Sequence, residues 1–344
     1  MPEERKVSGG AEGLPSVGIV TVGTYVPESV ETWQEMSEKS GFPEKVFVDR
    51  IGIRQKPIAA PDEHPGDLGV KAALDAVHRA GIDPAEIDLV LFGGCAFYDY
   101  GVWSPSAHIQ NAIGAHQAFA YEVKNGCNGG NLGLHLASRH LMADPDLEYA
   151  LVVCSDVFSR LVNYQDERII SMFPGGDGAT AALLRKNHDG NRILSYSGIS
   201  DGSLVDAVRV PAGGTRMAAD TGRGSFWQID DPEQLASVFS NLYLKNYVHV
   251  VREALRKSGH TVEEIDFLFT NQVKKSTAQS ILEALGLTPE KTCRTMELYG
   301  HLASSDTLLG LARTLEEERI QPGDLVVLAS SGIGFHWAAT VVQY

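Results

Sequence analysis

The sequence predicts an α/β protein whose sheet is covered by helices on both faces. Short β-branched segments alternate with helical segments from Val17 onward, and the strands are nearly continuous apolar runs. The pattern of segments also repeats along the chain, which predicts two halves of similar architecture. With 344 residues, 43% hydrophobic and 21% charged, the chain has the composition of a globular protein and the length for two domains or one large one.

The elements expected in the first half follow one another in a regular order. Strands are predicted at 17–23, 87–94, 119–123 and 149–156, and helices at 67–80, 104–113 and 129–143. The first residues are polar and rich in glycine, which predicts a loose tail. We therefore expect a tail (1–13), an N-terminal half (14–190) and a C-terminal half (191–344).

Two pairs of segments carry the repeat. Residues 80–92 and 258–269 each have a glycine, a short turn and the letters EID before an apolar strand, with an offset of 178. Residues 150–155 and 324–330 are also alike, with an offset of 174. Any two strand–helix units look somewhat similar, but the shared order of elements favours a duplication.

Charge and cysteine content narrow the classes of function. Lys and Arg number 29 against 44 Asp and Glu, a net charge of −15, which argues against binding to nucleic acid or to an anionic membrane surface. There is neither an apolar run of about 18 residues nor a recognisable targeting segment, so a cytoplasmic location is expected. The four cysteines are dispersed without a CxxC pair, so neither a disulfide framework nor a metal site is expected.

One cysteine has the setting of a nucleophile. Cys127 lies in NGCNGGN, between an apolar strand and a leucine-rich helical segment. Glycines allow a tight turn that presents the side chain at a helix N-terminus, where the helix dipole and free N–H groups stabilise a thiolate. Most cysteines are instead small buried hydrophobic residues, a role that suits Cys95, Cys154 and Cys293 better.

The repeat predicts a partner for this thiol. The offset of 174 leads from Cys127 to His301, which lies in another glycine-containing turn before an apolar helix. If an approximate two-fold axis relates the halves, the two helix N-termini meet and bring thiol and imidazole together. A Cys–His pair is the minimal arrangement that activates a thiol at neutral pH. The alternative is that His301 is purely structural.

Motifs over nearly the whole chain, from Val17 to Tyr344, resemble a known family. They are GIRQKPIAAP (52–61), WSPSAHIQNAIG (103–114), the segment ending at Cys127, ALVVCSDVFSR (150–160), FPGGDGATAALL (173–184) and DLVVLASSGIGFHWAATVV (324–342). They resemble the thiolase-fold condensing enzymes, within them the β-ketoacyl-acyl-carrier-protein synthase III group. The resemblance implies a thiolase-like five-layered αβαβα fold with two duplicated halves, a homodimer, no permanently bound cofactor, and acyl groups carried by coenzyme A or by the phosphopantetheine of an acyl carrier protein.

The chain departs from the pattern of that group at two polar site positions. In synthase III a His-Gln pair follows the second-half strand and an Asn follows a later glycine, and both support decarboxylation of a malonyl unit. Here the matching residues are Asn271-Gln272 and Gly300-His301, so histidine and asparagine have exchanged places. Thiolases have this order, but they need a second cysteine where Ser330 stands. The chain therefore has no obvious second base for carbanion chemistry.

A smaller branch, the synthase III-like acyltransferases of natural-product pathways, is similar both in the place of the histidine and in lacking the second cysteine. These enzymes use a Cys or Ser, a His and an Asp to pass an acyl group to oxygen or nitrogen. Asp306 is our candidate for orienting His301. Five residues on a helix turn through about 500°, so His301 must lie in the preceding loop if the two side chains are to meet. The alternative is that Asp306 only complements the helix dipole.

The remaining site residues are predicted from the resemblance and from residue type. The oxyanion hole is assigned to the backbone N–H groups of Cys127 and Ile333, and at the position of Ile333 the family usually has glycine. Asn271 is expected to form a hydrogen bond with the thioester or the acceptor. The other candidates contact carrier, partner subunit or acceptor: Arg50, Lys274 and Lys275 as a local basic surface for the carrier, Trp103 in a loop that crosses a dimer interface, and Phe226 and Trp227 on the acceptor side.

These observations predict a ping-pong acyl transfer. Cys127 takes an acyl group from an acyl-carrier-protein or CoA thioester, and His301 then deprotonates a small hydroxyl or amine acceptor. The runner-up is a synthase III-type Claisen condensation that forms a carbon–carbon bond, decarboxylative or not. A third possibility is a pseudo-enzyme subunit that shapes a partner's pocket, although Cys127 in its glycine turn argues against that.

Overall fold

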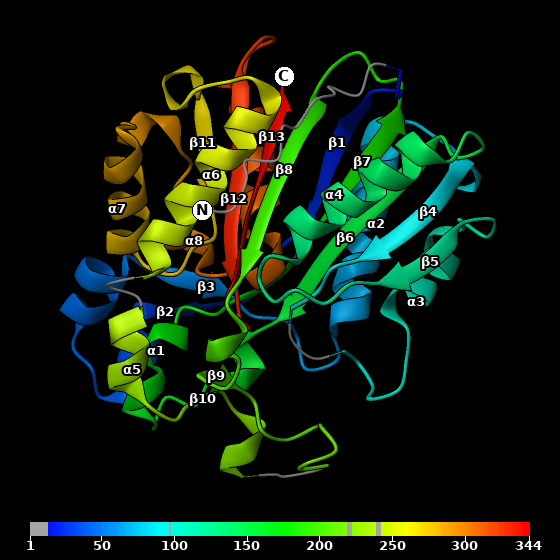
Figure 1. Cartoon of the computed structure of the whole chain (residues 1–344). Helices are drawn as coiled ribbons and strands as arrows, with labels where there is room; N and C mark the ends of the chain where they lie inside the picture. Colours follow the sequence, from blue (N-terminus) through cyan, green and yellow to red (C-terminus); the bar gives the residue numbers. More distant parts are fainter. Residues whose placement is uncertain (1–12, 96–97, 219–221, 239–241) are drawn as a thin grey trace.

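Two sets of strands with matching topology form the centre of the protein (Figure 1). The computed structural model describes residues 13–95, 98–218, 222–238 and 242–344. The predicted tail lies outside these residues except for Gly13.

The N-terminal set contains five strands in the order β1-β7-β6-β4-β5. β4 runs parallel to β5 and β6, whereas β7 is antiparallel to β6 and β1. Every strand and helix predicted for this half is confirmed, with ends that differ by two residues or fewer. Its elements are β1 (Val17–Tyr25), α2 (Pro65–Ala80), β4 (Ile87–Phe92), α3 (Pro105–Ile113), β5 (Phe119–Glu122), α4 (Gly129–Ala143), β6 (Tyr149–Val157) and β7 (Asp177–Lys186).

The C-terminal set repeats this arrangement in the order β8-β13-β12-β11. The two segments with EID lie at equivalent places, and Gly81 and Gly259 end α2 and α6 in the same left-handed conformation. The duplication is therefore confirmed, although β5 has no counterpart among the described strands. The elements are β8 (Arg192–Ser200), α6 (Leu244–Ser258), β11 (Phe267–Thr270), α7 (Lys275–Leu285), α9 (Asp306–Glu316), β12 (Leu325–Gly332) and β13 (His336–Gln343).

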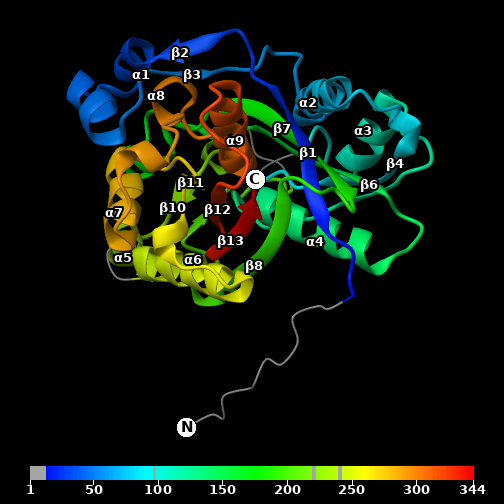
Figure 2. The ribbon, with the colours of Figure 1, turned by 90° about the horizontal axis from the view of Figure 1, so that it is seen from above.

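Helices α4 and α9 form the middle layer, because each contacts strands of both halves. Figure 2 shows α9 near the centre of the molecule, with the strands of the two halves on either side. Outside them, α2 and α3 cover the N-terminal strands and α6, with α7 beside it, covers the C-terminal strands, which gives the expected five layers. The edge strands β1 and β8 meet at Gly18 and Arg192, so the nine strands form one continuous sheet.

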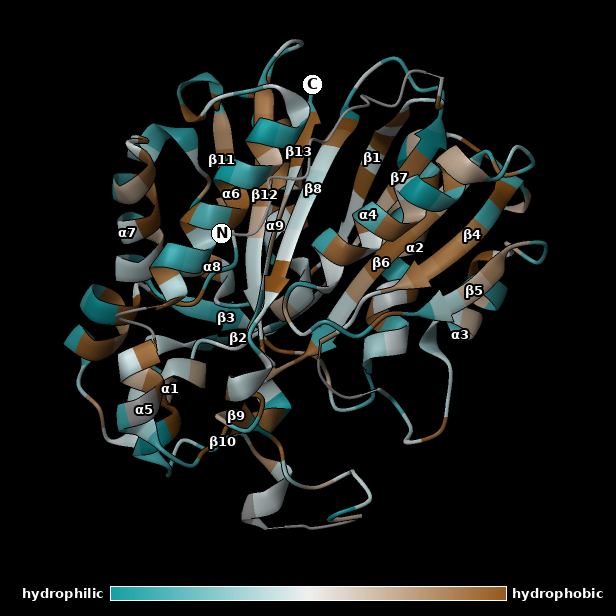
Figure 3. Cartoon of the chain, in the orientation of Figure 1, coloured by the Kyte–Doolittle hydropathy of each residue, from teal (hydrophilic) through white to brown (hydrophobic). Residues whose placement is uncertain are grey.

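The middle layer is held by a buried apolar cluster that includes Val152, Leu308 and Leu328. Figure 3 shows the matching pattern, with hydrophobic residues along β4 and β6 and hydrophilic residues on α6. Because α4 and α9 are both packed into this layer, their first turns are held in fixed positions relative to each other.

The shorter elements lie at and beyond one end of the strands (Figure 1). They are β2 (Val30–Thr32), α1 (Trp33–Ser40), the π-helical turn η1 (Val46–Ile51), β3 (Gln55–Pro57), β9 (Val208–Arg209), β10 (Gln228–Ile229), α5 (Pro232–Val238) and α8 (Met296–Tyr299). Within the described ranges, none of the helices combines the length and the apolar character that crossing a membrane would require.

Candidate active site

Cys127 lies in the turn between β5 and α4, directly before the helix N-cap Asn128. The preceding Gly126 has a φ of +57°, and a Cβ atom there would lie 2.6 Å from the amide nitrogen of Ile333. Only glycine fits such a position without strain. The predicted glycine turn at the start of the helix is therefore present, and it leaves Cys127 only 6% exposed.

His301 lies in the turn between α8 and the short helix η10 (Ala303–Ser305). Its amide N–H donates to the carbonyl of Pro174 over 2.9 Å, and its carbonyl accepts from the N–H of Gly176 over 3.0 Å. The glycine-rich segment 173–176 thus fixes the backbone of the histidine. The ring of Phe158 packs against the imidazole, with 5.5 Å between the ring centres.

The thiol, the imidazole and the carboxylate form one hydrogen-bonded line. Cys127 Sγ lies 3.3 Å from His301 Nε2, and His301 Nδ1 lies 2.5 Å from Asp306 Oδ2. Asp306 is the first residue of α9, and its carboxylate also accepts from the backbone N–H groups of Leu302 (2.8 Å) and Gln272 (2.6 Å). Because His301 precedes the helix, the five-residue spacing allows the contact.

The two helix N-termini meet, as the repeat predicts. A Cβ atom at Gly130 in the first turn of α4 would lie 2.9 Å from the carbonyl oxygen of Ser304, just before α9. Cys127 and His301 are therefore brought together by equivalent places in the two halves, 174 residues apart.

The electrostatics of the site favour an ion pair between Cys127 and His301. A hydrogen bond from Cys95 lowers the pKa of Cys127, burial raises it, and a positive His301 lowers it, so that it falls to about 5. Burial lowers the pKa of His301, but the negative charges of Asp306 and Cys127 outweigh burial and raise it well above its usual value. At neutral pH the cysteine is therefore a thiolate beside an imidazolium.

Asn271 follows β11 and lines the same cavity as Cys127 and His301. Its Oδ1 accepts from the hydroxyl of Tyr247 (2.7 Å) and from the N–H of Ser331 (3.1 Å), while its Nδ2 lies 3.4 Å from Ser331 Oγ. The oxygen is thus occupied by donors, so the amide nitrogen is the group that can donate to a bound molecule.

The backbone amides of Cys127 and Ile333 lie on segments in close contact. A Cβ atom at Gly332 would lie 3.0 Å from the amide nitrogen of Cys127, and one at Gly126 would lie close to that of Ile333. Two backbone N–H groups beside a nucleophile are the groups that an oxyanion hole needs, so the assignment to Cys127 and Ile333 stays a prediction that this proximity supports. The half-buried Ile333 also lines the cavity, so its side chain narrows the space over the thiol.

A small cavity of ≈ 70 Å³ lies at Cys127. Its volume is far below the roughly 300 Å³ at which pockets for drug-sized ligands begin. Its wall is largely aromatic and aliphatic, and includes Phe158, Val208, Tyr243, Phe335 and Trp337. Such a wall favours a small apolar group next to the sulfur.

A second cavity, of ≈ 510 Å³, adjoins the first and shares Ser171 and Val273 with it. Arg50 from η1 and Lys274 and Lys275 at the start of α7 all line this second cavity. The three basic residues singled out from the sequence are therefore gathered at one opening next to the thiol, although their segments are far apart in the chain.

The three aromatic residues predicted to contact substrate do not line the cavity at Cys127. Trp227 is buried one layer behind it, with its ring 5.1 Å from that of Phe158, and Phe226 is half-buried beside it. Trp227 therefore supports the wall rather than forms it. Trp103 packs against Tyr100 and His108 of its own chain, and its approach to a partner subunit stays a prediction.

Cys95 is a site residue that the sequence interpretation missed. Its Sγ lies 3.5 Å from Cys127 Sγ, and its side chain is also 6% exposed. The available signal was the pair Gly93-Gly94 directly after an apolar strand. β4 and β5 are parallel neighbours, so the residues that follow their carboxyl ends lie at the same edge of the sheet.

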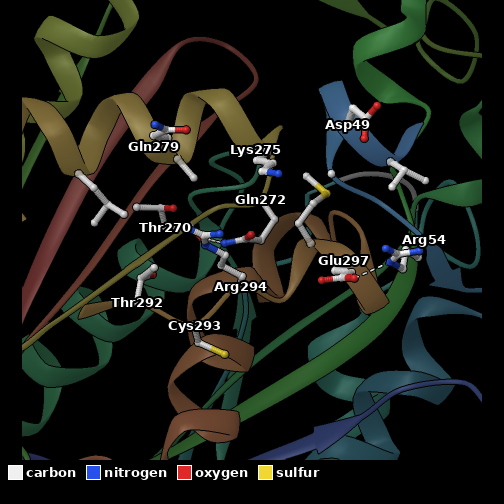
Figure 4. A pocket seen from close by; sticks show the side chains of 15 residues that line it. Asp49, Arg54, Thr270, Gln272, Lys275, Gln279, Thr292, Cys293, Arg294 and Glu297 are labelled. Atoms are coloured by element: carbon white, nitrogen blue, oxygen red, sulfur yellow. Dashed lines mark hydrogen bonds and ion pairs between the residues drawn. The ribbon is translucent and has the colours of Figure 1, made fainter. Parts of the chain in front are cut away.

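A third cavity, of ≈ 330 Å³, lies between α7, η1 and the segment before α8 (Figure 4) and shares Asp49, Lys275 and Gln279 with the second. Figure 4 shows Gln272 on its wall and the ion pair of Arg54 with Glu297 at another side, 2.6 Å apart. Neither Cys127 nor His301 lines this cavity. Within the described ranges, no group of three or more His, Cys, Asp and Glu residues is arranged to hold a metal ion.

The duplicated five-layered fold, with a cysteine and a histidine at facing helix N-termini, defines a thiolase-like enzyme. Residues 121–202 match the family described as 3-oxoacyl-[acyl-carrier-protein (ACP)] synthase III, and residues 255–344 match its C-terminal part. The chain belongs to this family, and it is an enzyme of the ketosynthase III type within the acyltransferases.

Individual relatives agree over nearly the full length. The β-ketoacyl-[acyl-carrier-protein] synthase III of Symbiobacterium thermophilum is 32% identical over 95% of this chain and 98% of its own. The crystal structure of the Thermus thermophilus synthase III is 27% identical, with a TM-score of 0.85 over 95% of this chain and 99% of that one. The priming β-ketosynthase of the R1128 polyketide pathway shares the fold, with 24% identity and a TM-score of 0.87 over 96% and 97% of the two chains.

Proposed function

We propose that the protein transfers an acyl group from a thioester, through an acyl-cysteine at Cys127, to a hydroxyl or amine acceptor. The observation that carries this proposal is the continuous line from Cys127 through His301 to Asp306. A thiol paired with an imidazole, itself oriented by a carboxylate, is the arrangement of nucleophilic acyl transfer.

In the first half-reaction the Cys127 thiolate attacks the thioester carbonyl. The N–H groups of Cys127 and Ile333 stabilise the oxyanion. When the intermediate collapses, the carbon–sulfur bond to the carrier breaks and the leaving thiolate takes the proton of the His301 imidazolium. Cys127 then carries the acyl group, and His301 is neutral.

In the second half-reaction His301 acts as a general base. Acylation removes the negative charge of Cys127 and with it one of the interactions that raise the pKa of His301. Asp306 keeps Nδ1 protonated, so the lone pair on Nε2 faces the acyl group and takes the proton of the acceptor. The acceptor oxygen or nitrogen attacks the carbonyl, and the thiolate of Cys127 leaves.

The second candidate is a condensation that forms a carbon–carbon bond. The relatives are named β-ketoacyl-[acyl-carrier-protein] synthase III, and these names support the condensation more directly than transfer to oxygen or nitrogen. Asn271 and His301 line one cavity, so two polar side chains are available to the enolate of a malonyl thioester. The exchanged order of histidine and asparagine, and the carboxylate on His301, favour the first candidate.

We propose coenzyme A or an acyl carrier protein as the donor, with no permanently bound cofactor. Its pantetheine arm would reach Cys127 from the basic cavity of Arg50, Lys274 and Lys275, which offers positive charge in a chain whose net charge is −15. The family resemblance supports a homodimer, in which the loop of Trp103 would approach the partner subunit.

Intact-mass analysis tests the common first step and product analysis separates the candidates. The parent and Cys127→Ala are incubated with a panel of acyl-CoA and acyl-carrier-protein donors. An acyl adduct on the parent alone is expected, and an adduct on both chains or on neither would contradict the mechanism. Alcohols, amines and malonyl thioesters are then offered: an ester or amide supports the first candidate, and CO₂ with a β-keto product supports the second.

Charge reversal at the basic cavity tests the route of the donor. Lys274→Glu is expected to raise KM for acyl-CoA by about fivefold, since an exposed ion pair contributes up to about 1 kcal/mol. A donor without phosphate, such as an N-acetylcysteamine thioester, should keep its KM. Lys257→Glu is the matched control, because Lys257 is exposed and does not line this cavity. The route would be contradicted if Lys274→Glu and Lys257→Glu changed KM for acyl-CoA equally, or if Lys274→Glu raised KM for both donors.

A further inference from the structure

The proposed mechanism leaves one buried thiol next to the nucleophile unused. Cys95 Sγ and Cys127 Sγ are 3.5 Å apart, whereas the sulfurs of a disulfide are separated by about 2.05 Å, so an approach of about 1.5 Å would join them. The other two cysteines occupy different places, Cys154 within β6 and Cys293 on the wall of the cavity in Figure 4.

The backbone holds the two thiols against each other. A Cβ atom at Gly129 would lie 1.9 Å from the carbonyl oxygen of Gly93, so the chain after β4 and the start of α4 are in direct contact. The amide of Cys95 donates over 2.8 Å to Oδ1 of the buried Asp156, whose Oδ2 accepts from the hydroxyl of Ser304 over 2.6 Å. Both thiol-bearing segments are thus tied to the region where α4 and α9 begin.

We propose that Cys95 and Cys127 form a reversible intramolecular disulfide when the enzyme meets a hydroperoxide. The disulfide would remove the nucleophile from catalysis and protect it from irreversible oxidation. This inference depends on the geometry of the thiols and on no particular acyl donor or acceptor.

The chemistry balances in two steps. The Cys127 thiolate attacks the peroxide and takes one oxygen with its hydrogen as a sulfenic acid; the O–O bond breaks, and the remaining oxygen takes the proton of the His301 imidazolium and leaves as water or an alcohol. The Cys95 sulfur then attacks the sulfenic sulfur; the S–S bond forms, and the hydroxyl group leaves with the Cys95 proton as water. The cysteines together lose two electrons, which the peroxide gains.

The environment of each thiol suits its role in this order. The hydrogen bond from Cys95 and the charge of His301 lower the pKa of Cys127, against the effect of burial, so Cys127 is the thiolate that meets the peroxide. The hydrogen bond to Cys127, burial and the negative charge of Cys127 raise the pKa of Cys95. Once Cys127 is a neutral sulfenic acid, that negative charge is gone and Cys95 ionises more easily.

Intact-mass analysis after treatment with hydrogen peroxide tests the proposal without any acyl substrate. The parent should lose the mass of two hydrogen atoms, with peptide mapping placing the bond between Cys95 and Cys127, and dithiothreitol should restore both thiols and all activity. Cys95→Ser should instead gain two or three oxygen atoms on Cys127 and lose its activity irreversibly. Cys293→Ser, the matched control, should behave as the parent does.

Several outcomes would overturn the proposal. They are a parent chain that gains oxygen without forming the disulfide, a disulfide between two chains, and the same loss of two hydrogen atoms in Cys95→Ser. The measurement on the parent stands alone if Cys95→Ser fails to fold, which its thermal unfolding curve would reveal.

Discussion

Replacing His301 with alanine is expected to slow the transfer of the acyl group from Cys127 to the acceptor by about 10²- to 10⁴-fold, the usual contribution of general acid–base catalysis. His301 Nε2 lies 3.3 Å from Cys127 Sγ and is the base nearest to the acyl group in the proposed mechanism. Single-turnover measurements on pre-acylated enzyme isolate this step.

The acylation step should respond differently to the same substitution. Without the imidazolium, the pKa of Cys127 rises, because a positive neighbour that lowers it is lost. Acylation by His301→Ala should therefore recover at alkaline pH, where the thiolate forms without help, whereas the transfer to the acceptor should not recover. The acyl-enzyme should accumulate in the variant and be visible by mass.

A second histidine provides the control for His301. His336 follows the loop of Ile333 and hydrogen-bonds through Nδ1 to Ser200 over 2.7 Å, but it does not line the cavity at Cys127. His336→Ala is expected to keep the parent rate of transfer. A parent-like rate in His301→Ala would rule out its role as the base.

The duplication made Cys127 and His301 predictable from the sequence. Glycine-flanked turns before helices can be recognised in the sequence, and the repeat offset relates the position of Cys127 in one half to that of His301 in the other. The contact forms because α4 and α9 share the middle layer, and that layer follows from the order of strands and helices. Elements with strong periodicity and clear glycine ends were therefore predicted to within two residues.

The contact between Asp306 and His301 could not be predicted from the sequence alone. From the sequence, its spacing from His301 fits a triad only if the histidine precedes the helix. The structure meets this condition, because His301 precedes the short helix η10, in which Ala303 has a φ of +50°, and α9 begins only at Asp306. The left-handed conformation of a non-glycine residue depends on surrounding contacts, which the sequence pattern does not show.

Cys95 was missed for a related reason. Residues that share a sheet edge are far apart in the chain, and a pattern read along the sequence treats each one alone. Cys95 lies 32 residues from Cys127, and only the parallel pairing of β4 and β5 makes them neighbours. Neither Phe226 nor Trp227 lines the cavity at Cys127, because residue type alone does not separate a cavity wall from the layer behind it, and their place on the acceptor side stays a prediction.

Replacing Asp306 with asparagine is expected to lower the rate of acyl transfer by about 10²-fold or more, because an amide that donates to His301 Nδ1 would move the imidazole proton to Nε2, where the base is needed. Asp306 raises the pKa of His301, so the variant loses the imidazolium at lower pH. Losing this positive neighbour raises the pKa of Cys127, whereas losing the negative charge of Asp306 lowers it. The first effect is the larger one, so the pKa of Cys127 should rise.

The pH dependence of iodoacetamide alkylation reports this change independently of any donor. The alkylation rate follows the fraction of thiolate, so in the parent it should rise through about pH 5 and stay level at neutral pH. In Asp306→Asn the midpoint should move to higher pH. A thermal unfolding curve must accompany the measurement, because the buried carboxylate also accepts from the N–H groups of Leu302 and Gln272. A folded variant with the parent's midpoint and transfer rate would show that Asp306 only complements the dipole of α9.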